Sequence, residues 1–257
     1  MSHYGPRMKK SEKPDKSQIV IHFPHNTEYN PENLKSLKEI RLASIDPARK
    51  NYALRIERWD YVNQIVQPII FDKFDLTNKK KEEEDNVVKM ESIYTNLSAK
   101  LDFFKNEFKF CNIFVIEKQP PLDYKTNRIS QHTISYFIEN FKNTDLCPLI
   151  IEVDPKYRCK VLGAPKLAYN PLKDWMIAYA INTFKVRNDQ ISLSIINKIK
   201  KKDDLADTAC QNIGIMKYFG IYFEPLPIND THTNFFQGEN FKTKKKSGYV
   251  LAITKKT

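Results

Sequence analysis

Three carboxylates open one apolar segment of the chain and are the strongest chemical signal in it. Lysines at positions 200–202 are followed by Asp203, Asp204 and Asp207. The apolar residues that come next recur at helical spacing: Leu205, Ala209, Ile213 and Met216. In such a helix the aspartates lie three and four residues apart on one face, where like charges repel. A single aspartate would only suit the helix dipole. Three favour a divalent cation bound by oxygen ligands, or open water, and with the lysines they indicate metal-assisted phosphodiester chemistry.

Two further acids end predicted strands. Asp46 closes the strand Ile40–Asp46, and Glu117 follows the apolar run Ile113–Ile116. Taken alone, Asp46 could initiate a turn before Pro47, and Glu117 could face solvent at a strand end. Together with the aspartate cluster they supply oxygen ligands for two Mg²⁺ ions about 4 Å apart, which would activate a water and neutralise a leaving oxygen. This chemistry requires no histidine.

Hydrophobic patterns predict the elements that must position these acids. Two strands beside Ile40–Asp46, at Tyr52–Trp59 and Gln67–Phe71, would complete an antiparallel meander. Helices and buried strands then alternate: a helix with apolar residues from Val87 to Phe108, the strand 113–116, a helix at 126–141, the strand 149–153, and helices from Leu172, Ser192 and the aspartate cluster. In this order, strand ends and a covering helix can bring the acids to one rim of a sheet.

Composition narrows the class of protein. The 257 residues are 41% hydrophobic and 12% aromatic, enough for a sizeable core. A net charge of +11 predicts a polyanionic partner, and nucleic acid is favoured over a membrane because no apolar run approaches roughly 18 residues. Six glycines leave no P-loop or dinucleotide fingerprint, so no nucleotide cofactor is expected.

The four cysteines predict neither zinc nor disulfides. They lie far apart without a Cys-x-x-Cys pair, at positions 111, 147, 159 and 210. We therefore expect buried thiols in a reducing, intracellular compartment. Three regions are expected along the chain: a basic N-terminal tail with a short strand (1–37), one catalytic domain (38–220) and a basic C-terminal extension (221–257).

Three motifs in order resemble a known family. Ser44-Ile45-Asp46 with Asn51, Ile116-Glu117-Lys118-Gln119 and Lys201–Asp207 are similar to motifs of the RuvC-type Holliday junction resolvases, closest to their poxviral, giant-virus and fungal mitochondrial branch. The resemblance covers roughly residues 38–220. It implies an RNase H-like α/β fold with a mixed five-stranded sheet, an antiparallel meander plus parallel strands, flanked by helices. It also implies a homodimer that cuts four-way DNA junctions by paired symmetric nicks and requires Mg²⁺ or Mn²⁺. The location that it implies is a viral factory, the host cytoplasm or an organelle matrix.

The resemblance assigns roles residue by residue. Asp46 would bridge two metal ions, Glu117 would be the second acid, and the closing Asp-x-x-Asp falls on Asp204 and Asp207. Asp203 is then a neighbour or a substitute ligand. The residues expected to contact DNA are Lys118, Gln119, Arg158, Lys160, Lys173, Lys201 and Lys202.

The chain departs from the family pattern at one position, and several alternative functions are still to be separated. The family usually has glycine where this chain has Ala48, which implies an ordinary right-handed turn. A proofreading exonuclease would want Asp-x-Glu at the first strand, and a ribonuclease H usually carries its glutamate on a helix. The alternatives to a resolvase are a non-catalytic junction-binding or architectural protein, a ribonuclease H, and a flap or branch nuclease. A non-catalytic protein could dispense with at least one of the four acids, and all four are present.

Overall fold

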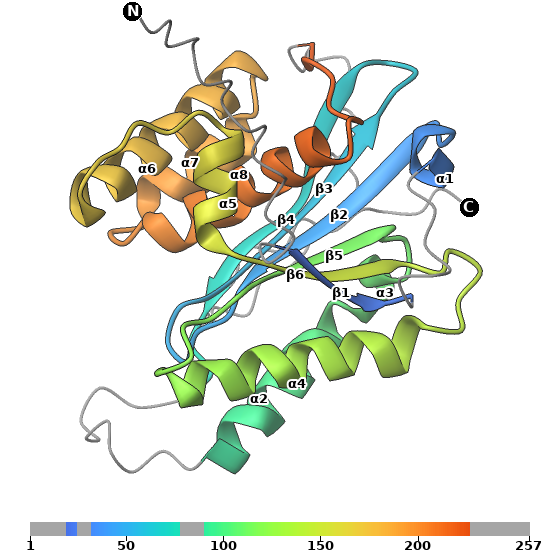
Figure 1. Ribbon diagram of the computed structural model, residues 1–257, viewed down its shortest axis with the longest axis vertical. Helices are drawn as coiled ribbons and strands as arrows, with labels where there is room; N and C mark the ends of the chain where they lie inside the picture. The colour runs from blue at the N-terminus through green and yellow to red at the C-terminus, as the bar shows by residue number, and fades with distance from the viewer. Residues whose placement is uncertain (1–18, 25–31, 78–89, 227–257) are drawn as a thin grey trace, which may run out of the picture.

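A six-stranded mixed sheet forms the centre of the molecule (Figure 1). The computed structural model describes residues 19–24, 32–77 and 90–226. The strands are β1 (Ile19–Phe23), β2 (Glu39–Asp46), β3 (Tyr52–Asp60), β4 (Ile65–Phe74), β5 (Ile113–Glu117) and β6 (Leu149–Val153), and their order in the sheet is β1-β6-β5-β2-β3-β4. β2, β3 and β4 form an antiparallel meander, whereas β5 runs parallel to both β2 and β6. The predicted α/β class with a mixed sheet is confirmed.

The sheet has one strand more than expected. β1 pairs antiparallel with β6, with Ile19 opposite Val153 and Ile21 opposite Ile151. Both isoleucines are partly buried against the hydrophobic core. This packing makes β1 an edge strand of the sheet, so the prediction of five strands is corrected to six.

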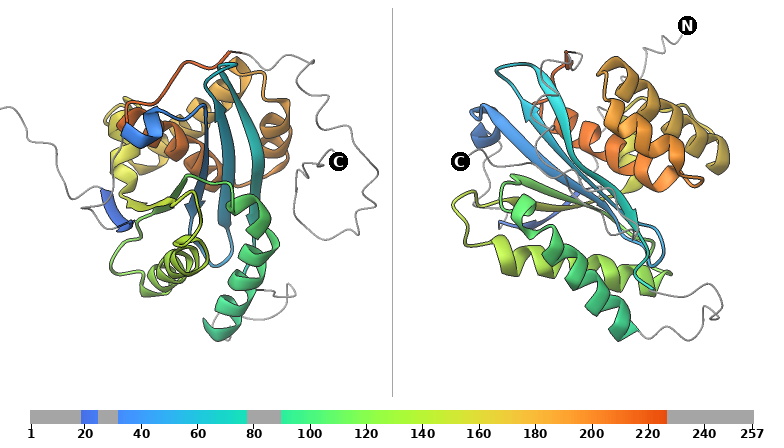
Figure 2. Two further views of the ribbon diagram at one scale, coloured as in Figure 1. Left: turned by 90° about the vertical axis from the view of Figure 1, so that its right-hand side faces the viewer. Right: turned by 180° about the vertical axis from the view of Figure 1, so that it is seen from behind.

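Helices cover the sheet on both sides. They are α1 (Glu32–Lys35), α2 (Met90–Phe103), α3 (Lys105–Phe108), α4 (Tyr124–Phe141), α5 (Pro155–Val161), α6 (Tyr169–Val186), α7 (Gln190–Lys198) and α8 (Asp203–Tyr218). α2 and α4 lie below the sheet in Figure 1, and α5 to α8 lie above it, an arrangement that both views of Figure 2 repeat. Within the described residues, no helix combines the length and apolar character needed to cross a membrane.

Alternation along the strands divides the core between these two layers. On β2, Leu42 packs in the cluster with α6, α7 and α8, whereas Ala43 and Ile45 pack in the cluster with α2 and α4. On β5, Ile113 and Val115 belong to the first cluster. Because side chains two residues apart share a face, the acids that end these two strands belong to the face covered by α8.

Sequence patterns predicted most elements, including the short strand β1, and missed short helices. The meander, β5, β6 and most long helices lie where the periodicity placed them. The helix predicted from Val87 to Phe108 is divided at Phe104 into α2 and α3, and Val87 itself is outside the described residues. The helix α5 was not predicted. It starts because the Asp154 side chain accepts a hydrogen bond from the Lys156 amide at 2.8 Å, and Pro155 occupies the first turn. Ala48 is not among the described residues with positive φ, as an ordinary turn requires.

The cysteines are only partly as predicted. All four are free thiols, and Cys111 and Cys210 are buried. Cys147 is exposed and Cys159 is half-buried, so the prediction of four buried thiols is corrected. Cys147 lies in the turn between α4 and β6 and has a positive φ, whereas Cys159 lies on the short helix α5.

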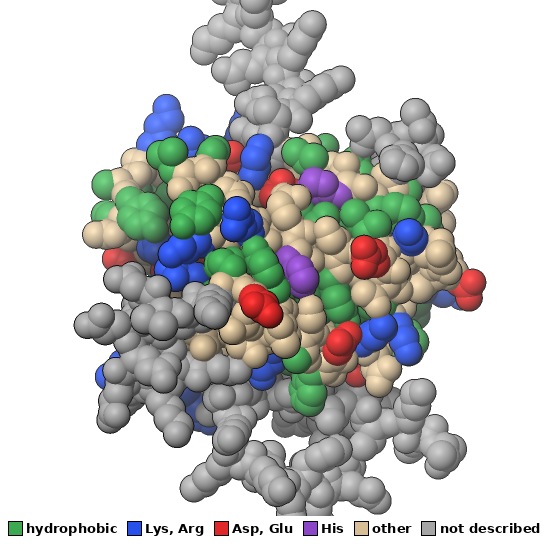
Figure 3. All heavy atoms as spheres, turned by 90° about the horizontal axis from the view of Figure 1, so that it is seen from below, with side chains coloured by type: hydrophobic (Ala, Val, Ile, Leu, Met, Phe, Trp, Pro, Cys, Tyr) green, Lys and Arg blue, Asp and Glu red, His purple; other side chains and the backbone are tan. Residues whose placement is uncertain are grey.

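The surface on the α2 and α4 side mixes charges of both signs. Figure 3, seen from below, shows Lys and Arg side chains interspersed with Asp and Glu on the visible described surface. The net positive charge of the chain therefore does not make this visible face uniformly basic. The basic residues that matter for the acids lie on the other side of the sheet, around α8.

Candidate metal centre

Strand register brings two of the predicted acids level with each other. β2 and β5 are parallel neighbours, with Ile45 opposite Ile116. Asp46 and Glu117 are the next residues, so both carboxylates come at the carboxyl ends of adjacent strands, on the face that α8 covers.

The helix α8 adds the third acid. Ligand oxygens of Asp46, Glu117 and Asp207 all lie within 4.8 Å of one another. The predicted apolar stripe of α8 is confirmed, since Leu205, Ala209, Ile213 and Met216 are each at most 1% exposed. The helix is in fact buried on most of its surface because it packs between α5, α6 and the sheet. An acid in its second turn is therefore held firmly beside the strand ends.

A buried arginine joins two of these carboxylates. The Arg158 guanidinium donates through Nη1 to Glu117 Oε2 and through Nη2 to Asp207 Oδ2, the second at 2.8 Å. Its position follows from topology: β6 runs parallel to β5 with Val153 level with Glu117, and α5 begins two residues later. One turn of α5 then brings the arginine back over the strand end. The Arg158 side chain is only 8% exposed.

Burial and crowding raise the pKa values of two of the acids. Burial raises the pKa of Asp46 well above its usual value, and the nearby Glu117 and Asp207 carboxylates add to this while Arg158 opposes it. Burial likewise raises the pKa of Asp207 to about 7, although Arg158 lowers it. For Arg158, burial lowers the pKa, but Glu117 and Asp207 outweigh burial and the net pKa is raised. Without a metal ion, Asp46 and Asp207 therefore bind protons more readily than ordinary aspartates do.

The three carboxylates fit a hard divalent cation. Mg²⁺ and Mn²⁺ are bound in proteins mainly by carboxylate, carbonyl and water oxygens, and three carboxylates that converge from two strand ends and a helix supply such a donor set. Two of the three are also the acceptors of Arg158. We conclude that the three carboxylates suit such an ion. The Arg158 guanidinium would compete with the ion for two of them.

The other two aspartates of the cluster are bound by lysines. Asp204 pairs with Lys73, at 3.3 Å between Nζ and Oδ2, and with Lys201. Asp203 accepts from Lys173 at 2.5 Å and lies 3.6 Å from the Lys201 ammonium. Burial tends to raise the pKa of Asp203, but the two lysines outweigh it and the pKa is lowered.

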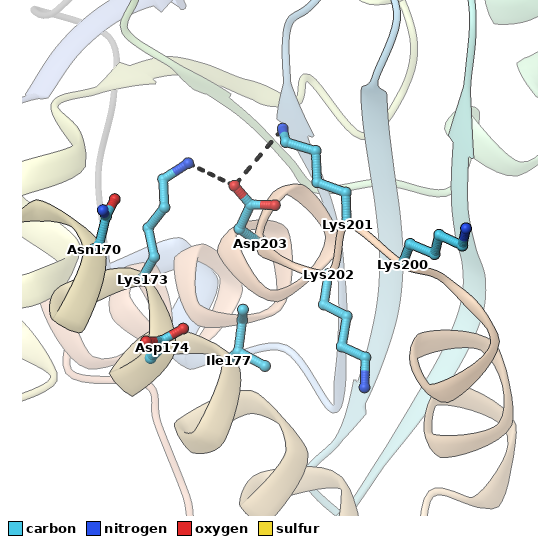
Figure 4. Close-up of a pocket in the computed structure, with 8 residues that line it drawn as sticks. All are labelled: Asn170, Lys173, Asp174, Ile177, Lys200, Lys201, Lys202 and Asp203. Carbon is cyan, nitrogen blue, oxygen red and sulfur yellow. Dashed lines mark hydrogen bonds and ion pairs between the residues drawn. The ribbon is translucent and has the colours of Figure 1, made fainter.

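Asp203 and Asp204 thus stand beside the three-acid group rather than in it. Figure 4 shows Lys173 and Lys201 directed at Asp203 from opposite sides. All three residues line a pocket of about 310 Å³. Asp204 is still near enough to raise the pKa of Asp46. The sequence-predicted role of Asp204 as a ligand stays a prediction.

One residue of this network was missed by the sequence reasoning. Lys73 lies near the end of β4, and its Nζ donates to the Lys201 carbonyl oxygen at 2.7 Å as well as to Asp204. It follows Phe71 on the same face of the strand, toward α8. The available signal was a lysine beside Asp72 near the end of the strand, which resembles an ordinary solvent-facing strand end.

The remaining predicted DNA contacts are not brought together. Lys160 is exposed on α5, and Lys118 is half-buried after β5. Gln119 donates to the Glu117 carbonyl oxygen at 3.2 Å. Lys202 points away from Asp203, in contrast to Lys201 (Figure 4). The basic residues with defined partners at the acids are therefore Arg158, Lys173, Lys201 and Lys73.

Comparison with known proteins supports the fold. No protein-family model matches the chain. "Uncharacterized protein 170L" of Invertebrate iridescent virus 6 is 28% identical over 166 residues, which are 57% of this chain and 68% of that protein.

Among solved structures, the yeast mitochondrial Holliday junction resolvase Ydc2 matches with a TM-score of 0.50 and 18% identity over 74% of this chain and 86% of its own. The Fowlpox virus resolvase in complex with substrate Holliday junction DNA matches with a TM-score of 0.49 and 19% identity, covering 70% of this chain and 97% of that one. At 18% identity, the yeast match supports a shared fold, in agreement with the mixed-sheet α/β architecture that was predicted.

Proposed function

We propose that this protein is a structure-selective DNA endonuclease that resolves four-way junctions by paired, symmetric nicks. The observation that carries the proposal is the convergence of Asp46, Glu117 and Asp207 within 4.8 Å, from two strand ends and one helix. The fold shared with a Holliday junction resolvase supports the choice of substrate. The net charge of +11 supports a nucleic-acid partner.

The proposed chemistry is metal-assisted hydrolysis of a phosphodiester. Asp46, Glu117 and Asp207, with Asp204 as a fourth acid, would hold Mg²⁺ or Mn²⁺. When bound, two such ions would activate a water and neutralise the leaving oxygen. The protein's own contribution is to fix the carboxylates on rigid strand ends and to present the Lys173 and Lys201 ammonium groups beside them. Those ammonium groups suit the phosphates of the strand to be cut.

Other functions on the same fold are separated by one assay. A ribonuclease H would cut an RNA–DNA hybrid, a flap or branch nuclease would cut branched substrates without symmetry, and an architectural protein would bind a junction without cutting it. We expect the purified protein with Mg²⁺ to nick a synthetic four-way junction at symmetric positions, and to leave linear duplex and RNA–DNA hybrid of the same sequence intact.

Variants of the acids test the site within that assay. Asp46→Asn, Glu117→Gln and Asp207→Asn should still bind the junction in a gel-shift assay but should not cut it. Asp145→Asn, which changes an exposed carboxylate in the α4–β6 turn, is the matched control and should cut normally. Cleavage by Asp46→Asn at the normal rate would contradict the assignment of Asp46 to the active site.

Paired nicks also require two active sites on one junction. We therefore propose a homodimer, which light scattering of the protein with and without junction DNA can measure. Two nicks within one bound junction, detected as linear duplex products from a cruciform plasmid, are the expected result. A monomer that makes single unpaired nicks would contradict this part of the proposal.

A further inference from the structure

Arg158 binds two of the three carboxylates that would hold a metal ion. Its two terminal nitrogens bind Glu117 Oε2 and Asp207 Oδ2, which belong to two of the three converging carboxylates. Three carboxylates and one guanidinium leave the group with a formal charge of −2 when all are ionised. A divalent ion bound by the same carboxylates would therefore meet a positive charge already in contact with its ligands.

The arginine is anchored chiefly by these two carboxylates. Its Nε is buried and has no hydrogen-bond partner among the residues that the structure describes. The base of the side chain runs past Gly214 of α8, where an added Cβ would lie 3.6 Å from the Arg158 Cβ. The stem is therefore packed against the helix, while the hydrogen bonds of the guanidinium depend on the acids.

We propose that Arg158 is a positioning residue, the resident counter-cation of the three-acid site, which keeps Glu117 and Asp207 together and yields them to a divalent ion. This inference rests on the proposed function, because it concerns the same carboxylates. It makes metal loading an exchange of one cation for another rather than the assembly of a site from separated acids. The arginine and the ion then compete, and each weakens the binding of the other.

Metal binding without DNA tests this competition directly. The full-length protein is titrated with Mn²⁺ at pH 8, and free Mn²⁺ is measured by electron paramagnetic resonance. We expect Arg158→Met to bind Mn²⁺ about tenfold more tightly than the unmodified protein, within the usual range of coupling between two sites. Lys156→Met is the matched control, because it removes an equal charge from an exposed position of the same helix, and its affinity should be unchanged. Equal or weaker binding by Arg158→Met would overturn the proposal.

A second variant and a structure guard against misfolding of Arg158→Met. Arg158→Lys keeps the charge but offers a single ammonium group. Its Mn²⁺ affinity should therefore lie between the affinity of the unmodified protein and that of Arg158→Met. In a crystal structure of the unmodified protein with Mn²⁺, Arg158 should have lost its bond to Glu117 or to Asp207. An ion bound beside an arginine that keeps both bonds would refute the exchange. Neither measurement depends on cleavage, so a failure of the exchange would leave the proposed function to be tested separately by the junction assay.

Discussion

The crowded carboxylates must respond to protons and cations together. Asp46 and Asp207 lie close to Glu117, and Arg158 bonds both Glu117 and Asp207. Burial raises the pKa values of both aspartates. A proton and a metal ion relieve the same repulsion. The protonation of this one site therefore has measurable consequences for the stability of the whole protein.

We predict that the metal-free protein loses stability as pH rises from about 4 to about 7. Between the unfolded pKa of an aspartate, about 3.9, and the folded pKa of Asp207, about 7, the folded state binds more protons than the unfolded state. The free energy of unfolding then falls with increasing pH. Melting temperatures measured in EDTA across this range should show the decline.

The contribution of the site is isolated by difference. His132 acts in the opposite direction, because burial lowers its pKa and the folded state binds fewer protons than the unfolded state below about pH 6.5. Subtracting the profile of Asp207→Asn from that of the unmodified protein removes this background. A flat difference between pH 4 and 7 would show that Asp207 is ionised throughout.

We predict that Mg²⁺ raises the melting temperature of the protein, and that Asp207 and Asp204 of α8 contribute unequally to this rise. A ligand that binds only the folded state raises the melting temperature. We expect Asp207→Asn to lose most of the rise seen at millimolar Mg²⁺. Asp204→Asn should keep part of it, because the Asp204 carboxylate is bound by Lys73 and Lys201. Equal losses in the two variants would make Asp204 a ligand of the same standing.

Sequence reasoning identified the acids but not their partners. Asp46, Glu117 and Asp207 were found because each breaks an apolar pattern at the end of a strand or the start of a helix. The bonds of Arg158 to two of them depend on the path of α5 over the sheet, which no local pattern contains. For the same reason, the pairing of Lys73 with Asp204 across β4 and α8 could not be predicted.

At the scale of elements, a second buried charge network links the meander to α6 and α7. Arg55 on β3 is fully buried, binds Glu57 Oε1 at 2.6 Å and lies 3.3 Å from Asp189 at the start of α7. Its guanidinium also lies against the rings of Phe71 and Phe184, at 4.4 and 4.7 Å from their centroids. The network thus joins the meander to the connection between α6 and α7, the two helices that precede α8 in the chain.

We predict that Arg55→Met lowers the free energy of unfolding by about 3–5 kcal/mol, because it leaves buried acids without their partner. Urea denaturation followed by circular dichroism measures this. Arg58→Met on the same strand is the control: its ion pairs with Glu39 and Asp60 are partly exposed, and its loss should cost at most about 1 kcal/mol. Equal effects of the two substitutions would mean that burial of the Arg55 network adds nothing.

Elements with strong periodicity were predictable, and elements defined by pairing were not. Long helices such as α4 and α6 and buried strands such as β5 and β6 carry their own hydrophobic pattern. The short helix α5 has only one capping aspartate and one proline as signals. β1 was an isolated apolar run, and its place in the sheet depends on β6, which lies more than a hundred residues later.

At the scale of the whole molecule, charge is unevenly distributed along the chain. Residues 242–257 contain six lysines and no acid, although the chain as a whole has a net charge of +11. A segment of this composition would be expected to contact DNA phosphates without regard to the base sequence.

We predict that deleting residues 242–257 weakens binding to junction and duplex DNA alike. Each lost phosphate contact should reduce the slope of log affinity against log salt concentration by about 0.9. Fluorescence anisotropy at several salt concentrations measures the slope, and full-length protein with the six lysines changed to serine should match the deletion. An unchanged slope would show that this segment does not contact DNA.

The position of α8 has a consequence for the nascent chain. Asp46 and Glu117 are made early in synthesis, but the third carboxylate arrives only with α8, after all six strands have left the ribosome. A partly made or partly unfolded chain that lacks a docked α8 carries two acids that cannot form the site. The proposed nuclease activity would therefore require that α8 has docked against the strands that carry the other two acids.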